Sequence, residues 1–165
     1  MSQSVKIGMF TGVATVIYFL LFYFIDKPLL LHYGVFWSSM IVYLVGMYFA
    51  YKSASNNFES QLKNCFTVFL IANLIYYVFY YIMINIIDIS LQDELRLQAI
   101  EALEWSKTYA NSTAPSQLFD TAMEQAKTSS FRETPAKILM QMARGAIGGF
   151  LMAFGFTQLL RKIKI

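Results

Sequence analysis

Few side chains in this sequence have the type and spacing that catalysis or metal binding requires. The chain has one histidine, His32, and one cysteine, Cys65, so it can form neither a multi-histidine metal site nor an internal disulfide. It also lacks glycine-rich phosphate loops, serine nucleophile elbows and the HExxH motif. The sequence therefore predicts no catalytic residue, no metal site and no cofactor.

The remaining candidates for acid–base chemistry flank apolar segments. An enzyme acting on lipid or isoprenoid substrates would have to use Asp26, His32, Asp88 or Arg144. We expect instead that Asp88 and Arg144 form an ion pair. This pair would clamp the end of the third apolar segment to the start of the fourth.

Uncharged polar residues inside the apolar segments offer a second kind of chemistry. Asn73, Asn85 and Gln141 would line a path for a solute if several copies of the chain assembled around them. Such amides also join membrane helices through hydrogen bonds worth about 1 kcal/mol each. Proton transport would call for a carboxylate near the membrane midplane, and these polar residues are not ionisable. We therefore expect the second role, in which the amides join helices.

Tyrosine and phenylalanine crowd the segment from Tyr76 to Tyr81. Tyrosine is favoured at membrane–water interfaces, where its ring is in an apolar layer and its hydroxyl reaches water. The run therefore predicts an interfacial belt. A site for a cofactor such as a quinone is the alternative.

The elements that carry these residues follow from composition. Hydrophobic residues make up 57% of the 165-residue chain and charged residues 14%, against about 25% charged in soluble domains. Crossing a bilayer takes about 20 apolar residues in a helix. The sequence predicts an all-α integral membrane protein, a single membrane domain over residues 1–165 with four transmembrane helices at about 7–25, 33–51, 65–87 and 138–160.

The segment 88–137 has a different pattern. Its apolar residues recur at helical spacing while charged residues occupy the other side, which predicts an amphipathic helical hairpin between the third and fourth spans. The expected break at 111–115 contains Asn111-Ser112-Thr113, a glycosylation acceptor pattern that short sequences often match by chance.

Orientation follows from the basic residues near the ends of the spans. With the N-terminus in the cytoplasm, the inner flanks carry Lys6, Lys52, Lys63, Arg161, Lys162 and Lys164. Eight of the ten acidic residues then lie in the 88–137 insertion on the outer side. We therefore expect a multi-pass protein of the bacterial inner membrane with both termini in the cytoplasm and an extracytoplasmic hairpin.

Glycines mark the positions where helices are expected to approach closely. Gly8 and Gly12 form one small-xxx-small pattern in the first span, and Gly145 and Gly149 form another in the fourth. The antiparallel course of these spans places the two patterns at opposite ends, so they cannot seal one contact together. At least one pattern should meet the second or third span, or a different subunit.

The layout resembles an uncharacterised family of small four-span bacterial inner-membrane proteins, known as a domain of unknown function. The resemblance covers nearly the whole chain and rests on the segments 8–12, 17–21 and 46–52, the aromatic third span ending near Ile87-Asp88, the acidic hairpin and the basic Arg161-Lys162 tail. It implies the class and topology given above, and it implies no activity.

Three functions are compatible with these features. The first is a non-enzymatic accessory or structural subunit that contacts the bilayer and either a protein partner or a second copy. The second is a small transporter or channel component formed by oligomerisation, and the third is a lipid-active enzyme. The net charge of +3 is small and scattered, so nucleic acid is not expected as a partner.

Overall fold

The computed structural model describes residues 1–109 and 116–163, and the regular structure in these ranges is helical. The chain divides into two compact units. Residues Met1–Tyr81 and Thr134–Ile165 form the first, here called the bundle unit. Residues Ile82–Glu133 form the second, here called the hairpin unit.

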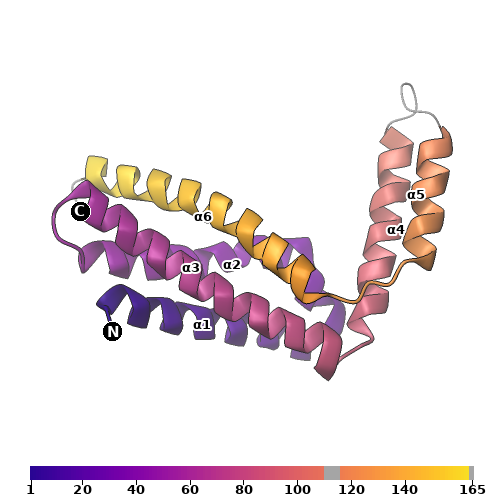
Figure 1. Cartoon of the computed structure of the whole chain (residues 1–165), viewed down its shortest axis with the longest axis horizontal. Helices are drawn as coiled ribbons and strands as arrows, with labels where there is room; N and C mark the ends of the chain where they lie inside the picture. The colour runs from indigo at the N-terminus through magenta and orange to yellow at the C-terminus, as the bar shows by residue number, and fades with distance from the viewer. Residues whose placement is uncertain (110–115, 164–165) are drawn as a thin grey trace. The chain divides into compact units, whose positions relative to one another are not determined.

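Four long helices lie side by side in the bundle unit (Figure 1). They are α1 (Gln3–Ile25), α2 (Tyr33–Lys52), α3 (Phe58–Ile82) and α6 (Pro135–Ile163), with a short 3₁₀ helix, η1 (Lys27–Leu31), between the first two. Each long helix, with α3 counted through to Ile87, is long and apolar enough to cross a membrane. The predicted all-α fold with four candidate membrane spans is confirmed.

The helices extend beyond the predicted spans. α3 begins at Phe58 rather than near residue 65, and α6 runs from Pro135 to Ile163 rather than from 138 to 160. A lysine such as Lys63 ends an apolar run but does not end a helix, because helical hydrogen bonding continues where the chain meets water. Long basic side chains also place their charge outside the hydrocarbon while their stems stay on the helix.

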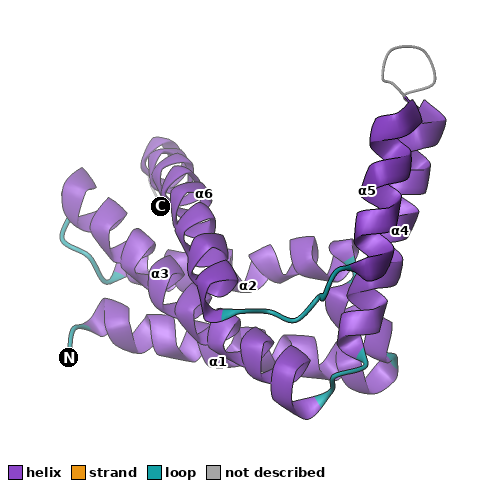
Figure 2. Ribbon diagram, turned by 45° about the vertical axis from the view of Figure 1, so that its right-hand side comes forward, coloured by secondary structure: helices purple, strands orange, loops and turns teal. Residues whose placement is uncertain are grey.

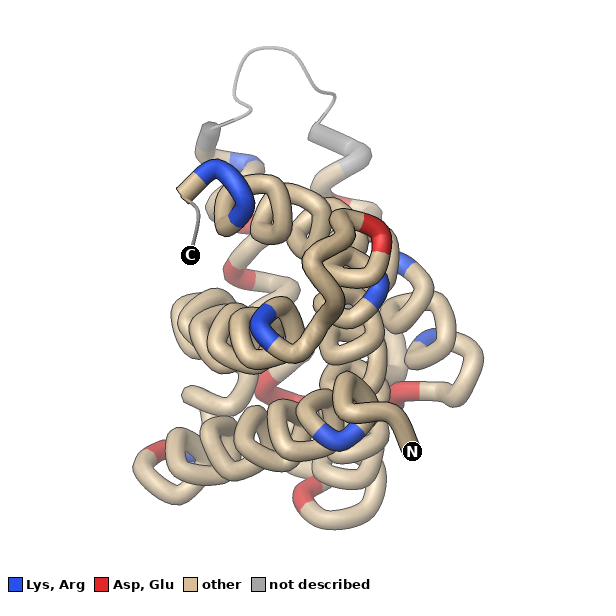
Figure 3. The backbone as a smooth tube through the Cα atoms, turned by 90° about the vertical axis from the view of Figure 1, so that its left-hand side faces the viewer, with Lys and Arg blue, Asp and Glu red and all other residues tan. Residues whose placement is uncertain are grey.

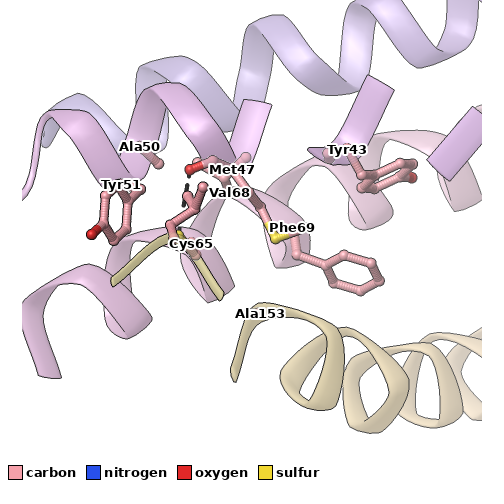
Figure 4. Packing of buried hydrophobic residues seen from close by; sticks show 10 residues of the cluster. Tyr43, Met47, Ala50, Tyr51, Cys65, Val68, Phe69 and Ala153 are labelled. Carbon is pink, nitrogen blue, oxygen red and sulfur yellow. Dashed lines mark hydrogen bonds between the residues drawn. The ribbon is translucent and has the colours of Figure 1, made fainter. Parts of the chain in front are cut away.

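α3 is the central helix of the bundle unit. Its Cys65 thiol donates to the Met47 carbonyl of α2 at 3.4 Å. On another side, the rings of Phe66 and Phe150 place α3 against α6, with centroids 5.5 Å apart. Buried side chains from α2, α3 and α6 form the core around these contacts, and Figure 4 shows residues of that cluster.

Glycines bring α1 against α3. A side chain on Gly8 would meet the backbone of Val68 at 3.3 Å, and one on Gly12 would meet the Cα of Ala72 at 3.1 Å. Both distances are shorter than ordinary van der Waals contact. The α1 backbone therefore lies directly on α3, which only residues without a side chain allow at these two positions.

The start of α1 and the end of α6 lie at the same end of the bundle unit, as does the α2–α3 connection (Figure 1). Figure 3 faces this end, with Lys and Arg in blue on turns close to the viewer. The middle of each long helix is mostly uncharged.

The hairpin unit contains a π-helical turn, η2 (Met83–Ile87), followed by α4 (Leu91–Tyr109) and α5 (Ser116–Thr128). Figure 2 shows α4 and α5 side by side. An ion pair between Lys107 and Asp120, with 2.7 Å between Nζ and Oδ1, joins the two helices. The predicted break at 111–115, including the Asn111 sequence pattern, lies outside the described residues.

A substitution at Gly12 tests the close approach of α1 to α3. Gly12→Val should lower the free energy of unfolding by about 1–3 kcal/mol, because the added carbons overlap Ile75 and Ala72. The measurement is the folded fraction as sodium dodecyl sulfate replaces a mild detergent. The matched control, Ala14→Val, adds a similar volume on the exposed side of α1 and should change stability by less than about 0.5 kcal/mol. Equal effects of the two variants would contradict the arrangement.

Candidate functional site

The bundle unit contains a cavity of about 320 Å³ bounded by all four long helices, here called the aromatic pocket. Seven of its lining side chains are aromatic: Phe19, Phe36, Trp37, Tyr43, Phe69, Tyr76 and Tyr77. Ser39, Met40, Asn73, Met152 and the glycines Gly145, Gly148 and Gly149 complete the lining. Its volume falls within the usual range for small-molecule sites.

Helical spacing directs these aromatic rings to one place. On α2, Phe36 and Tyr43 are seven residues apart, and on α3, Phe69 and Tyr76 have the same separation, so each pair shares a helix face. The two faces meet, with Tyr43 and Phe69 ring centroids 5.2 Å apart (Figure 4). Phe19 of α1 adds a third wall, with its centroid 4.9 Å from that of Tyr76.

The fourth wall is the backbone of α6. A side chain on Gly149 would overlap the ring of Phe69, and one on Gly145 would lie 3.0 Å from Nδ2 of Asn73. Gly149 therefore lets the Phe69 ring pack against the backbone of α6. Gly145 leaves the Asn73 amide uncovered on the pocket side.

Asn73 is the distinctive polar group of the aromatic pocket. Its side chain is 8% exposed, and its amide has no hydrogen-bond partner among the residues that the structure describes. Two other polar side chains of the lining have partners: the Ser39 hydroxyl donates to the Phe36 carbonyl at 2.6 Å, and the Tyr77 hydroxyl donates to the Gln141 carbonyl at 3.4 Å. A buried amide without a partner is uncommon and suits a ligand that supplies one.

The structure places all four predicted packing glycines against α3. Gly8 and Gly12 face residues 68–75, while Gly145 and Gly149 face residues 69–77. The two patterns were expected at opposite ends of the spans, yet both flank the same stretch of α3. α6 runs from Pro135 to Ile163, so Gly145 and Gly149 lie near its middle rather than at one end. At least one pattern was expected to meet the second or third span or a different subunit, and both meet the third span.

The predicted ion pair between Asp88 and Arg144 joins residues of different units and stays a prediction. Within the hairpin unit, the Asp88 carboxylate accepts the backbone N–H of Ser90 at 3.1 Å and also its hydroxyl. Within the bundle unit, the Arg144 guanidinium lies 3.5 Å from the sulfur of Met140.

The other acid–base candidates have local structural roles. His32 caps the N-terminus of α2, where its Nδ1 accepts the Gly34 N–H at 3.1 Å. Asp26 is the extended residue between α1 and η1. No group of three or more His, Cys, Asp or Glu side chains suited to a metal occurs within 1–109 and 116–163.

The polar amides divide between the units. Asn73 and Gln141 belong to the bundle unit, whereas Asn85 belongs to the hairpin unit, where its Nδ2 donates to the Glu133 carbonyl at 2.9 Å. The predicted tyrosine belt is wrong for Tyr76, which is 7% exposed and lies inside the bundle. Phe19, Phe36 and Trp37 were not predicted as site residues, because they lie on helices other than that of Tyr76 and only the folded structure brings them together.

Comparison with known proteins gives one match. The family model described as protein of unknown function (DUF4199) covers residues 6–162, nearly the whole chain. Neither the curated proteins nor the solved structures contain a significant match.

Two adjacent glycines of α6 test the backbone wall of the aromatic pocket. Gly149→Ala should lower the free energy of unfolding by about 1–3 kcal/mol, because the new methyl group displaces the Phe69 ring. Gly148→Ala should cause no such loss, since nothing lies within 4 Å of the added carbon. Thermal unfolding in detergent, followed by circular dichroism, measures both. A Gly149→Ala protein as stable as Gly148→Ala would contradict the Phe69 contact.

Proposed function

This chain belongs to the DUF4199 family of proteins of unknown function, and we propose that it is a non-enzymatic subunit of a membrane complex. In this proposal another membrane helix, from a protein partner or a second copy, packs on the outer side of α6. The exposed character of α6 is the observation that carries the proposal.

α6 is the least buried of the four candidate spans. Its apolar window is 17% buried, compared with 28%, 33% and 39% for the other three. The outer α6 face consists of Gly148, Leu151, Gly155 and Gln158, all exposed. Their spacing of three and four residues places them on one side of the helix, opposite the buried Gly149, Ala153 and Thr157.

Two features make the outer α6 face better suited to protein than to lipid. A Cβ atom added to Gly148 or Gly155 would meet nothing within 4 Å, so both glycines leave hollows that a neighbouring helix would fill. Gln158 places an amide on the same face, and its burial in hydrocarbon without a partner is costly. A helix that packs there would fill the hollows and bond the amide.

The roles of the acid–base candidates support a function without catalysis. His32 and Asp88 bond to backbone N–H groups next to helix ends, and Asp26 forms the junction between α1 and η1. These contacts account for the presence of each residue without assigning it a reaction. A lipid-active enzyme is therefore the least supported of the three candidates.

A transporter or channel component is the second candidate, because the Asn73 amide faces the aromatic pocket without a protein partner among the described residues. Such a component would need a polar path made by several copies. Purified protein in sealed vesicles would then conduct a solute, and Asn73→Leu would abolish that conductance. If vesicles that contain the protein showed neither an ionic current nor an osmotic volume change, this candidate would be wrong.

We further propose that the chain resides in a bacterial inner membrane with both termini in the cytoplasm. The basic residues at the end of the bundle unit that holds both termini support this orientation, because Lys and Arg favour the cytoplasmic side. The acidic hairpin unit would then be extracytoplasmic.

Substitutions on the outer α6 face test the proposed association. In native-lipid particles, the wild-type complex should exceed the 19.0 kDa of one chain. A mass that is a multiple of this value would identify a second copy, and any other added mass a partner. The double variant Gly155→Leu, Gln158→Leu should release the single chain. The new leucine side chain would fill the hollow at Gly155, and the hydrogen bond from the Gln158 amide to the neighbouring helix would be lost.

The control for association is Ala14→Leu, which adds comparable bulk to the exposed side of α1. This variant should keep the mass of the wild-type complex. A wild-type chain that is monomeric in native lipid would overturn the proposed function.

Reporter fusions test the orientation. Green fluorescent protein should fluoresce when fused to either terminus, because it folds in the cytoplasm, and alkaline phosphatase fused at either terminus should be inactive. Phosphatase inserted near residue 112 should be active. Opposite compartments for the two termini would contradict both the orientation and the even number of spans.

A further inference from the structure

We propose that the aromatic pocket binds the ring of a lipid-soluble quinone, with a ring carbonyl accepting a hydrogen bond from the Asn73 amide. This inference concerns the inner side of the bundle unit and does not depend on the proposed association through α6. It assigns binding only.

The size of the pocket limits its occupant to a small molecule. About 320 Å³ accommodates one or two fused rings with the start of a tail, but not a helix, whose diameter with side chains is about 10–12 Å. Since the pocket is bounded by helices that are apolar enough to cross a membrane, molecules dissolved in the bilayer have the most direct access to it.

The walls of the pocket favour a flat, apolar ring. Phe19, Tyr43, Phe69 and Tyr76 surround it with aromatic surfaces, and aromatic rings pack on one another in offset or edge-to-face contacts. On the remaining side, Gly145 presents helix backbone without a side chain, which leaves the Asn73 amide facing the pocket. Sugars and charged headgroups would lose water here without enough polar partners.

The chemistry of Asn73 selects a ring that carries a carbonyl. The side chain is 8% exposed, its amide has no partner within the described ranges, and Gly145 leaves it uncovered. An N–H donor in an apolar wall is satisfied by an isolated acceptor on an apolar ligand. Acyl chains lack such an acceptor, and a quinone carries two on a flat ring.

Trp37 provides a direct readout of binding. It lines the aromatic pocket, and the second tryptophan of the chain, Trp105, lies on α4 in the hairpin unit. In a Trp105→Phe protein, Trp37 is therefore the sole tryptophan. Quinones quench tryptophan fluorescence at short range, so titration with decylubiquinone in detergent should give saturable quenching.

Variants in the Trp105→Phe background test the hydrogen bond. Asn73→Leu should raise the decylubiquinone concentration at half-saturation about five- to tenfold, as expected for loss of one buried hydrogen bond. Gly145→Ala should also weaken binding, because its methyl group covers the amide. The matched control, Asn64→Leu, makes the same change on α3 outside the pocket and should bind as the parent does.

Three outcomes would overturn the inference. One is quenching of Trp37 that rises with the decylubiquinone concentration without saturating. Another is unchanged binding in both Asn73→Leu and Gly145→Ala, with helix content by circular dichroism confirming that each variant is folded. The last is displacement of decylubiquinone by an equal concentration of decylbenzene, which has a ring and a tail but no carbonyl. None of these outcomes depends on the mass of the complex. The quinone inference and the proposed association through α6 can therefore be disproved independently of each other.

Discussion

The close approach of two helix backbones to α3 is the constraint on which the bundle unit depends. In a bilayer, lipid tails are as apolar as side chains, so helices associate through packing and hydrogen bonds rather than through hydrophobic burial. Gly8 and Gly12 of α1, and Gly145 and Gly149 of α6, remove the side chains that would keep these backbones away from α3. The middle of α3 is thereby held from two sides, and α2 packs on it through the Cys65–Met47 contact.

The glycines that allow this packing also shape the aromatic pocket. At Gly149 the space left by the missing side chain is filled by the Phe69 ring, which gives contact. At Gly145 the corresponding space leaves the Asn73 amide facing the pocket, which gives a potential binding group. Two glycines four positions apart thus have different effects. Gly149 gives a packing contact because it faces Phe69, whereas Gly145 leaves a polar group exposed to the cavity because it faces Asn73.

The four spans could be predicted because the length of an apolar run with little or no charge is a local property of the sequence. Helix ends such as Phe58 could not, since polar residues end the run without ending the helix. The packing glycines could be recognised by type, whereas their common partner, α3, depends on tertiary structure. Tyr76 was assigned to an interface because sequence spacing does not reveal which helix face is inward, and for the same reason Phe36 and Trp37 were missed.

The two proposals use opposite sides of α6. Gly145 and Gly149 face α3, whereas Gly155 and Gln158 face outward, and the helix backbone separates them. The two sides meet at Gly148, which borders the aromatic pocket and belongs to the outer α6 face. A helix seated on the outer face would therefore lie beside the pocket without replacing its α6 wall. Apart from Gly148, ligand binding and association accordingly depend on different residues of one helix, and either can be lost while the other is kept.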